Sequence, residues 1–203
     1  NGNPELVSKG LLRLLKRRPY CLAKGLRDPA VPLVPVSIFS GFGGQGIIKS
    51  GMLIGKAASL YDNKFATLTQ SFGPEARGGA CSAQVVIDDD RVLYPYIVTP
   101  EILVAMSQEA YEKFIKDPQK GSIVLTDTDL VKPKTKRKDV KMFSIPSTRF
   151  AEEMGNRIFA NVIMVVFFTA IKNIVTLDAM KKALPGSVPE RFIDKNIEAL
   201  EKG

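Results

Sequence analysis

No histidine occurs among the 203 residues, and only two cysteines are present, Cys21 and Cys81. The absence of histidine excludes Ser-His-Asp and Cys-His catalytic sites, the usual zinc sites and the commonest general base. Two cysteines cannot by themselves form a disulfide framework, a zinc ribbon or an iron–sulfur cluster site. Any chemistry near this chain must therefore come from carboxylates, lysine, arginine, backbone groups, or a cofactor held elsewhere.

Long uninterrupted apolar runs are also lacking. The most apolar segment, residues 157–174, is interrupted by Asn161, and its apolar portion is shorter than the ~20 residues that span a bilayer. We therefore expect this segment to form a buried helix at the core or at a subunit interface, and we expect no membrane span.

Acidic residues are fewer than basic ones, which leaves a net charge of +8. Residues 1–30 and residues 132–141 each carry a net charge of +5, so the remainder is close to −2. Neither basic segment has the interleaved aromatic residues that are typical of nucleic-acid binding. The sequence therefore predicts no nucleic-acid partner.

The first 35 residues differ in composition from the rest of the chain. Residues 5–18 have the pattern of a short basic amphipathic helix, and four prolines between positions 19 and 35 then interrupt any helix. We expect residues 1–35 to be a basic extension or linker that packs on a surface, and residues 36–203 to form one domain. A membrane-surface or targeting role is the alternative for the extension.

The order of elements over residues 36–203 predicts an α/β protein in which strands come first and helices finish the chain. We expect a first strand that begins at Val36 and runs into the glycines from Gly41, and further strands at 64–72, 81–87, 91–98, 101–107, 122–130 and 140–146. We expect helices at 47–60, 108–116, from Ser147, and at 157–174, 177–184 and 189–202. Aspartates 88–90 predict a tight turn that pairs strands 81–87 and 91–98 as a β-hairpin.

One stretch organises the domain: residues 36–46, an apolar strand that runs into Gly41, Gly43, Gly44 and Gly46. A strand, a glycine turn and a helix together present backbone N–H groups to an anion, usually a phosphate. Glycine allows positive φ there and lets a ligand approach the backbone closely. We predict that the N–H groups of residues 43–47, helped by the helix dipole, bind an anion. Alternatively, the glycines only let the helix pack close to the sheet.

The same glycines match the dinucleotide spacing G-x-G-x-x-G, at Gly41, Gly43 and Gly46. The second strand ends near residues 70–71 without the acidic residue that would bind a ribose hydroxyl. The residues directly after Gly46 are Ile47 and Ile48, so the Lys49-Ser50 pair is not where a Walker motif requires it. These two departures disfavour an NAD or FAD site. A standalone Rossmann-like nucleotide-binding oxidoreductase is the alternative function that the glycine spacing alone suggests.

Other candidate residues each have two interpretations. Arg77, in the glycine-rich loop 73–79, has a guanidinium suited to a phosphate or carboxylate, or else forms an ion pair or a subunit contact. Lys49 either reaches a bound phosphate or is a solvated surface lysine. Cys81 is expected to be a small buried residue. The acidic run at 127–129 suggests loop caps and turns more than a metal site.

Four motifs together resemble a known family. They are GFGGQG after an apolar strand, SFGPEARGG about thirty residues later, the hydrophobic run that follows Pro100, and NRIFANVIMV near the C-terminus. This combination resembles the gamma subunit of 2-oxoacid:ferredoxin oxidoreductases and the gamma domain of single-chain pyruvate:ferredoxin oxidoreductases. The resemblance covers residues 36–203 and is strongest to the 2-oxoglutarate branch.

The resemblance implies a mixed, largely parallel sheet with flanking helices. It implies a cytoplasmic hetero-oligomer that oxidatively decarboxylates 2-oxoglutarate, or a related 2-oxoacid, to acyl-CoA and reduces ferredoxin. Thiamine diphosphate, Mg²⁺ and [4Fe–4S] clusters would lie in alpha, beta and possibly ferredoxin-like delta subunits, and this chain would bind none of them. Its part would be coenzyme A binding and subunit assembly, so it would not be catalytic alone.

The resemblance also assigns site residues. It implies contacts to the coenzyme A phosphates from two motifs, at Gly41, Gly43, Gly44, Gln45, Gly46 and Arg77. Asn161 falls where the family has an asparagine at the start of the apolar helix. Residues 1–35 have no counterpart in the family. The basic segment 132–141 either contacts an acidic partner such as ferredoxin or is a solvated loop.

Overall fold

The computed structural model describes residues 36–73, 79–92, 97, 99–133, 137–188 and 190–202. The basic helix expected at 5–18, the position of Arg77 and most of the strand expected at 91–98 lie outside these ranges. Over the described residues, the strand and helix predictions can be compared directly with the structure.

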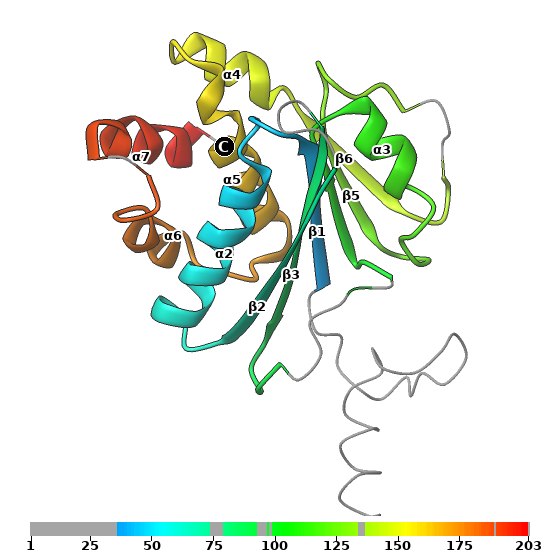
Figure 1. The fold of residues 1–203 in the computed structure, drawn as a ribbon, viewed down its shortest axis with the longest axis horizontal. Helices are drawn as coiled ribbons and strands as arrows, with labels where there is room; N and C mark the ends of the chain where they lie inside the picture. Colours follow the sequence, from blue (N-terminus) through cyan, green and yellow to red (C-terminus); the bar gives the residue numbers. More distant parts are fainter. Residues whose placement is uncertain are drawn as a thin grey trace, which may run out of the picture. The chain divides into compact units, whose positions relative to one another are not determined.

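Six strands form one mixed sheet in the order β2-β3-β1-β4-β5-β6 (Figure 1). They are β1 (Val36–Phe42), β2 (Phe65–Phe72), β3 (Ala80–Asp88), β4 (Ile102–Ala105), β5 (Ile123–Asp127) and β6 (Lys141–Ile145). Strands β1, β4, β5 and β6 pair in parallel, whereas β3 is antiparallel to both β1 and β2. The expected mixed, largely parallel sheet is therefore confirmed.

The hairpin is present, but its predicted partner was wrong. Strand β3 pairs with β2 from Phe65↔Asp88 to Phe72↔Cys81, and with β1 from Val36↔Val86 to Phe42↔Ala80. Both hydrogen-bonding edges of β3 are thus occupied over residues 81–86, which leaves no edge of β3 there for a further strand. The tight turn of aspartates closes β3, and the hairpin partner precedes β3 in the chain.

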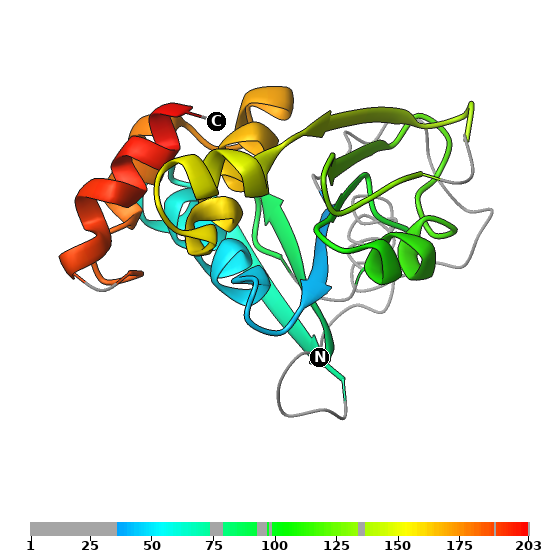
Figure 2. The ribbon, with the colours of Figure 1, turned by 90° about the horizontal axis from the view of Figure 1, so that it is seen from above.

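Helices cover both faces of the sheet (Figures 1 and 2). One face carries α2 (Ile47–Tyr61), α5 (Ala160–Lys172), α6 (Leu177–Ala183) and α7 (Ile193–Lys202). The other carries α3 (Gln108–Phe114), and α4 (Ser147–Glu153) packs against α5. Two 3₁₀ turns, Arg157–Phe159 and Glu190–Phe192, precede α5 and α7, so the helices expected at 157–174 and 189–202 each begin later than predicted.

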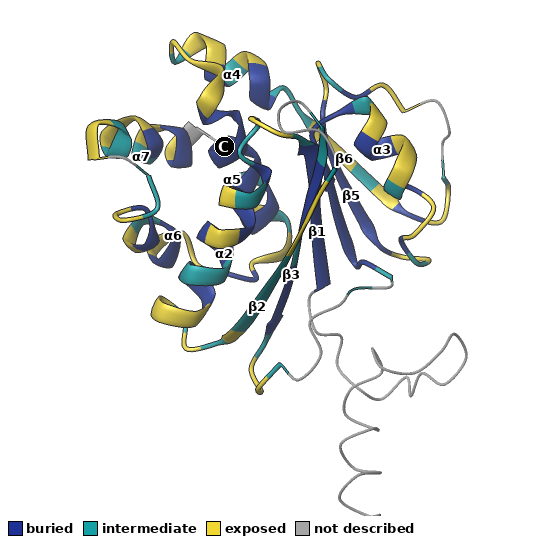
Figure 3. Ribbon diagram, viewed as in Figure 1, coloured by how far each residue is buried: buried dark blue, intermediate teal, exposed yellow. Residues whose placement is uncertain are grey.

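The two faces of β1 serve two separate cores because successive side chains of a strand point to opposite sides. Phe39 belongs to the larger core and meets Phe168 of α5 with ring centroids 5.1 Å apart. Ile38 belongs to the smaller core with Tyr111 of α3. Figure 3 shows the resulting band of buried residues through the central strands. None of the helices in the described ranges is long and apolar enough to cross a membrane.

The carboxyl ends of β1, β4, β5 and β6 meet at one edge of the sheet, because these strands are parallel. Helix α2 follows β1, α3 follows β4, and α4 follows β6, so three helix N-termini gather at this edge. Ligands of open α/β sheets bind outside this edge. The fold therefore places the glycine turn where a ligand site is expected.

Candidate functional site

The glycine turn joins β1 to α2 and uses positive φ at two positions. Gly44 has φ of +100° and Gly46, the N-cap residue of α2, has φ of +76°. The carbonyl oxygen of Gly46 accepts the Ser50 N–H at 2.9 Å and the Ser50 hydroxyl at 3.1 Å, which starts the helix. Residues that carry a side chain rarely adopt such φ values, so the turn favours glycine at both positions.

Gln45 holds the turn against the sheet. Its Oε1 accepts the Phe42 N–H at 2.7 Å, and its Nε2 donates to the Met106 carbonyl at 2.8 Å. A Cβ atom on Gly41 would lie 2.5 Å from this Oε1, so Gly41 provides the space for the Gln45 side chain. Gly41 and Gln45 therefore build the turn, because the Gln45 carboxamide is bonded within the protein.

We expect Gln45→Leu to lower the free energy of unfolding by about 2 kcal/mol, because it leaves two partly buried backbone groups without their partner. Urea denaturation of the purified chain measures this loss. Gln70→Leu is the control, since Gln70 is exposed on edge strand β2. Equal stability losses in the two variants would contradict the proposed role of Gln45.

Some N–H groups of the turn are already bonded. Gly43 N–H donates to the Gly79 carbonyl at 2.8 Å, and Gln45 N–H donates to the Phe42 carbonyl at 3.2 Å. Within the described part of the chain, the N–H groups of Gly44, Gly46 and Ile47 have no hydrogen-bond acceptor. The first turn of α2 contains no acidic residue and has no side-chain cap. This positive helix end is therefore available to an external anion through fewer N–H groups than the sequence predicts.

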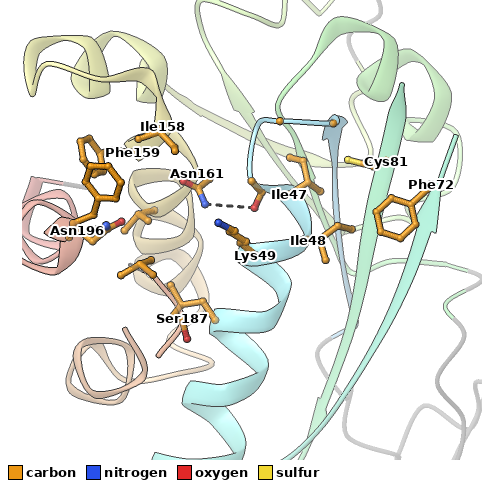
Figure 4. A pocket seen from close by; sticks show the side chains of 17 residues that line it. Ile47, Ile48, Lys49, Phe72, Cys81, Ile158, Phe159, Asn161, Ser187 and Asn196 are labelled. Carbon is orange, nitrogen blue, oxygen red and sulfur yellow. Dashed lines mark hydrogen bonds between the residues drawn. The ribbon is translucent and has the colours of Figure 1, made fainter. Parts of the chain in front are cut away.

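A pocket of about 320 Å³ opens between this turn, α2, α5 and α7. Its wall is largely apolar and includes Ile47, Leu53, Phe159, Val162, Val188 and Phe192. Lys49 reaches from α2 toward α5 in Figure 4, and Asn161 and Asn196 lie on the opposite side. A ligand whose anionic group binds at the turn would thus place an adjoining apolar group in the pocket.

The acidic run at 127–129 forms caps, as expected. The Asp127 carboxylate is fully buried; its Oδ1 accepts the N–H groups of Asp129 and Leu130. Its Oδ2 accepts the Ser147 hydroxyl and the N–H and hydroxyl of Thr148 at the start of α4. No group of three potential metal-ligating side chains occurs among the residues that the structure describes.

Cys81 is buried, as predicted, with 8% of its surface exposed, and it contributes to the pocket wall. Burial raises the pKa of its thiol, because removal from water disfavours the thiolate. Cys81 is therefore an apolar wall residue and a poor nucleophile.

Part of the basic segment 132–141 is fixed to the protein. Arg137 donates to the carbonyl oxygens of Ile115 and Pro118 at 2.8 and 2.9 Å, and it pairs with Asp139. The hydrogen bond from Arg137 holds the pKa of Asp139 below its usual value. One of the six basic residues in this segment thus closes the C-terminal end of α3 rather than facing a partner.

The topology argues against a dinucleotide site. In a Rossmann unit the strand after the glycine helix pairs in parallel with the first strand. Here that strand is β2, which lies at the edge of the sheet and pairs with β3 in the antiparallel direction. The G-x-G-x-x-G spacing therefore occurs without the βαβ unit that gives it its usual meaning.

Asn196 was missed by sequence reasoning. It lies one helical turn after Phe192 and one before Leu200, on the face of α7 that packs against the domain. An asparagine within the apolar face of an amphipathic helix was the available signal. Its place in a pocket with the glycine turn depends on contacts about 150 residues apart in the chain.

Comparisons with known proteins agree on one family of oxidoreductases. A family model described as pyruvate ferredoxin/flavodoxin oxidoreductase matches residues 36–203. The chain is 49% identical over 166 residues to the 2-oxoglutarate synthase subunit KorC of Methanocaldococcus jannaschii, covering 81% of this chain and 89% of the relative.

Solved structures have the same fold. The gamma subunit of a keto/oxoacid ferredoxin oxidoreductase from Geobacter sulfurreducens is 35% identical with a TM-score of 0.72, covering 82% of this chain and 94% of that one. A 2-oxoglutarate:ferredoxin oxidoreductase from Magnetococcus marinus, with 2-oxoglutarate, coenzyme A and succinyl-CoA bound, has a TM-score of 0.75 at 24% identity. The match covers 82% of this chain and 30% of that chain, and it concerns the fold alone.

Proposed function

From the premise that this chain belongs to the pyruvate ferredoxin/flavodoxin oxidoreductase family, as the gamma subunit of an oxoacid:ferredoxin oxidoreductase, we propose that it holds the phosphates of coenzyme A at its glycine turn. The chain binds and orients this substrate, and other subunits carry out the chemistry. The 2-oxoacid of the complex is 2-oxoglutarate, a proposal supported by the name of the relative from Methanocaldococcus jannaschii.

The observation that carries this proposal is the open N-terminus of α2. Three N–H groups there, those of Gly44, Gly46 and Ile47, have no acceptor among the described residues, and the turn is exposed at Gly43 and Gly44. Backbone N–H groups at a helix N-terminus favour phosphate oxygens through hydrogen bonds and the helix dipole.

Different residues of the motif have different roles in this proposal. Gly41 and Gln45 position the turn, and Gly43, Gly44 and Gly46 bring its backbone close to the phosphates. Lys49 lies beside the turn and adds a positive charge. Arg77 is a further phosphate contact in this proposal, since its PEARGG motif ends at Gly79, whose carbonyl accepts the Gly43 N–H.

We also propose the composition of the complex. Thiamine diphosphate, Mg²⁺ and [4Fe–4S] clusters belong to the alpha, beta and ferredoxin-like delta subunits, ferredoxin accepts the electrons, and the complex is cytoplasmic. Residues 1–35 are an extension that precedes the family domain. The lack of histidine and the presence of only two cysteines agree with a chain that supplies no reacting group.

The test compares the purified chain with its native assembly. We expect the isolated chain to show no reduction of ferredoxin with 2-oxoglutarate and coenzyme A, and the assembly with alpha and beta subunits to show it. Substantial activity of the isolated chain would refute the proposal. Tight binding of NAD(H), NADP(H) or FAD to the isolated chain would instead favour the nucleotide-dependent enzyme that the glycine spacing alone suggests.

A further inference from the structure

Strand β2 forms one edge of the sheet and carries none of the features that usually protect an edge (Figure 1). It runs for eight residues, 65–72, without a charged residue, proline or glycine, and it pairs with β3 without a bulge. The opposite edge strand, β6, has five residues, begins with the exposed Lys141 and follows the basic segment 132–141. Long uncharged edges are templates for another strand, so proteins generally shorten, charge or cover them. Strand β2 therefore has the properties of an edge that another strand covers.

The backbone alternation determines which groups β2 presents at this edge. Gly73 N–H donates to the Ala80 carbonyl at 2.7 Å, which continues the register of β2 and β3. Residues of an antiparallel strand bond alternately to one side and the other. The odd-numbered residues from 65 to 71 therefore bond to β3, and the even-numbered ones direct their N–H and C=O groups away from it. No described residue bonds to these outward groups, which belong to Ala66, Leu68, Gln70 and Phe72.

A second copy of β2 can bond to all of these outward groups. Two antiparallel copies with Thr69 opposite Thr69 bring every outward residue of one copy opposite an outward residue of the other. The hydrogen-bonded pairs are then Ala66 with Phe72 and Leu68 with Gln70. A shift of this register by two residues would leave at least one outward residue without its counterpart. The edge is therefore complementary to itself.

The side chains also fit this register. Phe72, which is 67% exposed, would face Ala66, and Phe65, which is 49% exposed, would face Gly73. Each large ring thus lies opposite a residue with little or no side chain. Thr69 would face Thr69, and such cross-strand threonine pairs are favourable.

Apolar surface accompanies the unprotected edge. Eight large hydrophobic side chains are exposed in the described ranges, and five of them lie on β2 or on α2, which packs against it. These five are Met52, Leu60, Tyr61, Phe65 and Phe72. The basic segment 132–141 connects β5 to β6 and therefore belongs to the opposite edge of the sheet. Apolar contacts beside the paired strands would extend the interface without bringing this positive charge into it.

We propose that two copies of this chain pair edge to edge through β2, so that their sheets become one continuous sheet. The two-fold axis passes between the two Thr69 residues and runs perpendicular to the sheet. Both copies contribute the same residues to such an interface, because it is isologous.

Sedimentation of the purified full chain over a range of concentrations tests this pairing. We expect the unmodified chain to show a monomer–dimer equilibrium. Thr69→Lys places two ammonium groups opposite each other at the axis, so we expect the dimer dissociation constant to rise about tenfold or more. Thr67→Lys is the matched control, because it adds the same charge to the same strand but faces Ser71 of the second copy. It should raise the constant less than about threefold.

A charge-reversed variant distinguishes a broken contact from a misfolded strand. Thr69→Glu should weaken self-association as Thr69→Lys does, because like charges again face each other. An equimolar mixture of the two variants should associate at least as tightly as the unmodified chain. Mixing cannot restore association to strands that fail to fold.

Disulfide formation tests the same contact in the native assembly. Thr69 is a non-hydrogen-bonded position of the proposed pair, where Cα atoms lie about 4.5 Å apart, a distance that a disulfide spans. Thr69→Cys should therefore link two copies of this chain under mild oxidation, whereas Thr67→Cys should not. Both variants carry Cys21→Ser, because Cys81 is buried and Cys21 lies outside the described residues.

Three results would overturn the proposal. The first is an unmodified chain that remains monomeric up to about 1 mM, a concentration at which even a weak specific dimer forms. The second is equal weakening by Thr67→Lys and Thr69→Lys, which would contradict the two-fold axis at Thr69. The third is a disulfide that joins Thr69→Cys to a different subunit of the assembly, which would show that β2 pairs with that subunit instead.

Discussion

Asp127→Ala is expected to lower the free energy of unfolding by about 4 kcal/mol, because it removes a buried carboxylate that accepts five hydrogen bonds. The donors are backbone N–H groups of Asp129, Leu130 and Thr148 and the hydroxyls of Ser147 and Thr148. Alanine leaves these donors buried or partly buried without an acceptor. Urea denaturation of the purified chain, followed by circular dichroism, measures the change.

Asp129→Ala is the control from the same turn. The Asp129 carboxylate pairs with Arg149 at 2.6 Å, and 60% of the Arg149 side chain is exposed. Exposed pairs of this kind contribute less than about 1 kcal/mol. Similar losses in the two variants would mean that Asp127 does not join β5 to the start of α4 in the way described.

Gly44→Val is expected to raise the KM for coenzyme A in the assembled complex roughly fiftyfold, because a hydrogen bond to a charged group contributes about 1.5–3 kcal/mol. Gly44 is exposed and its N–H is available, whereas the N–H of Gly43 is bonded to Gly79. A side chain at Gly44 would keep the phosphate from the backbone. The kcat should change little, since the phosphates lie away from the reacting thiol.

Backbone strain needs its own control, because Gly44 has φ of +100°. Gly121 has φ of +86° in the loop before β5, and a Cβ atom at either glycine would meet no heavy atom within 4 Å. Gly121→Val should therefore impose a comparable strain and leave the KM for coenzyme A unchanged. If both variants raise the KM equally, strain rather than blocked phosphate contacts is the cause.

Local sequence patterns identified most elements of this domain. The strand that begins at Val36 and the glycine turn after it match the prediction, because glycine adopts the positive φ values of Gly44 and Gly46 without steric cost. The two separate cores on either side of β1 were not predicted, because they depend on which helices cover each face of the sheet. The pairing of β3 was predicted wrongly because a tight aspartate turn indicates a reversal of the chain but does not identify the strand that takes the free edge.

The candidate site, like the fold, was predicted only in part from the sequence. The sequence indicated an anion site at the turn, and the family resemblance indicated which anion to expect. Neither could show that the Gln45 carboxamide is hydrogen-bonded to the Phe42 N–H and the Met106 carbonyl, or that the Gly43 N–H donates to the Gly79 carbonyl. These hydrogen bonds depend on how β1, β3 and β4 lie side by side, so the number of available N–H groups is a property of the sheet.

The sequence by itself determined the family, the turn and the residues whose backbone conformation only glycine can adopt, because these features depend on neighbours within a few positions. Only the tertiary structure decided the strand order and the pocket that joins the turn to Asn161 and Asn196. The physical reason is that a pocket is formed by packing between distant segments. The packing of α7 against α5 depends on the whole apolar core rather than on any short stretch of residues.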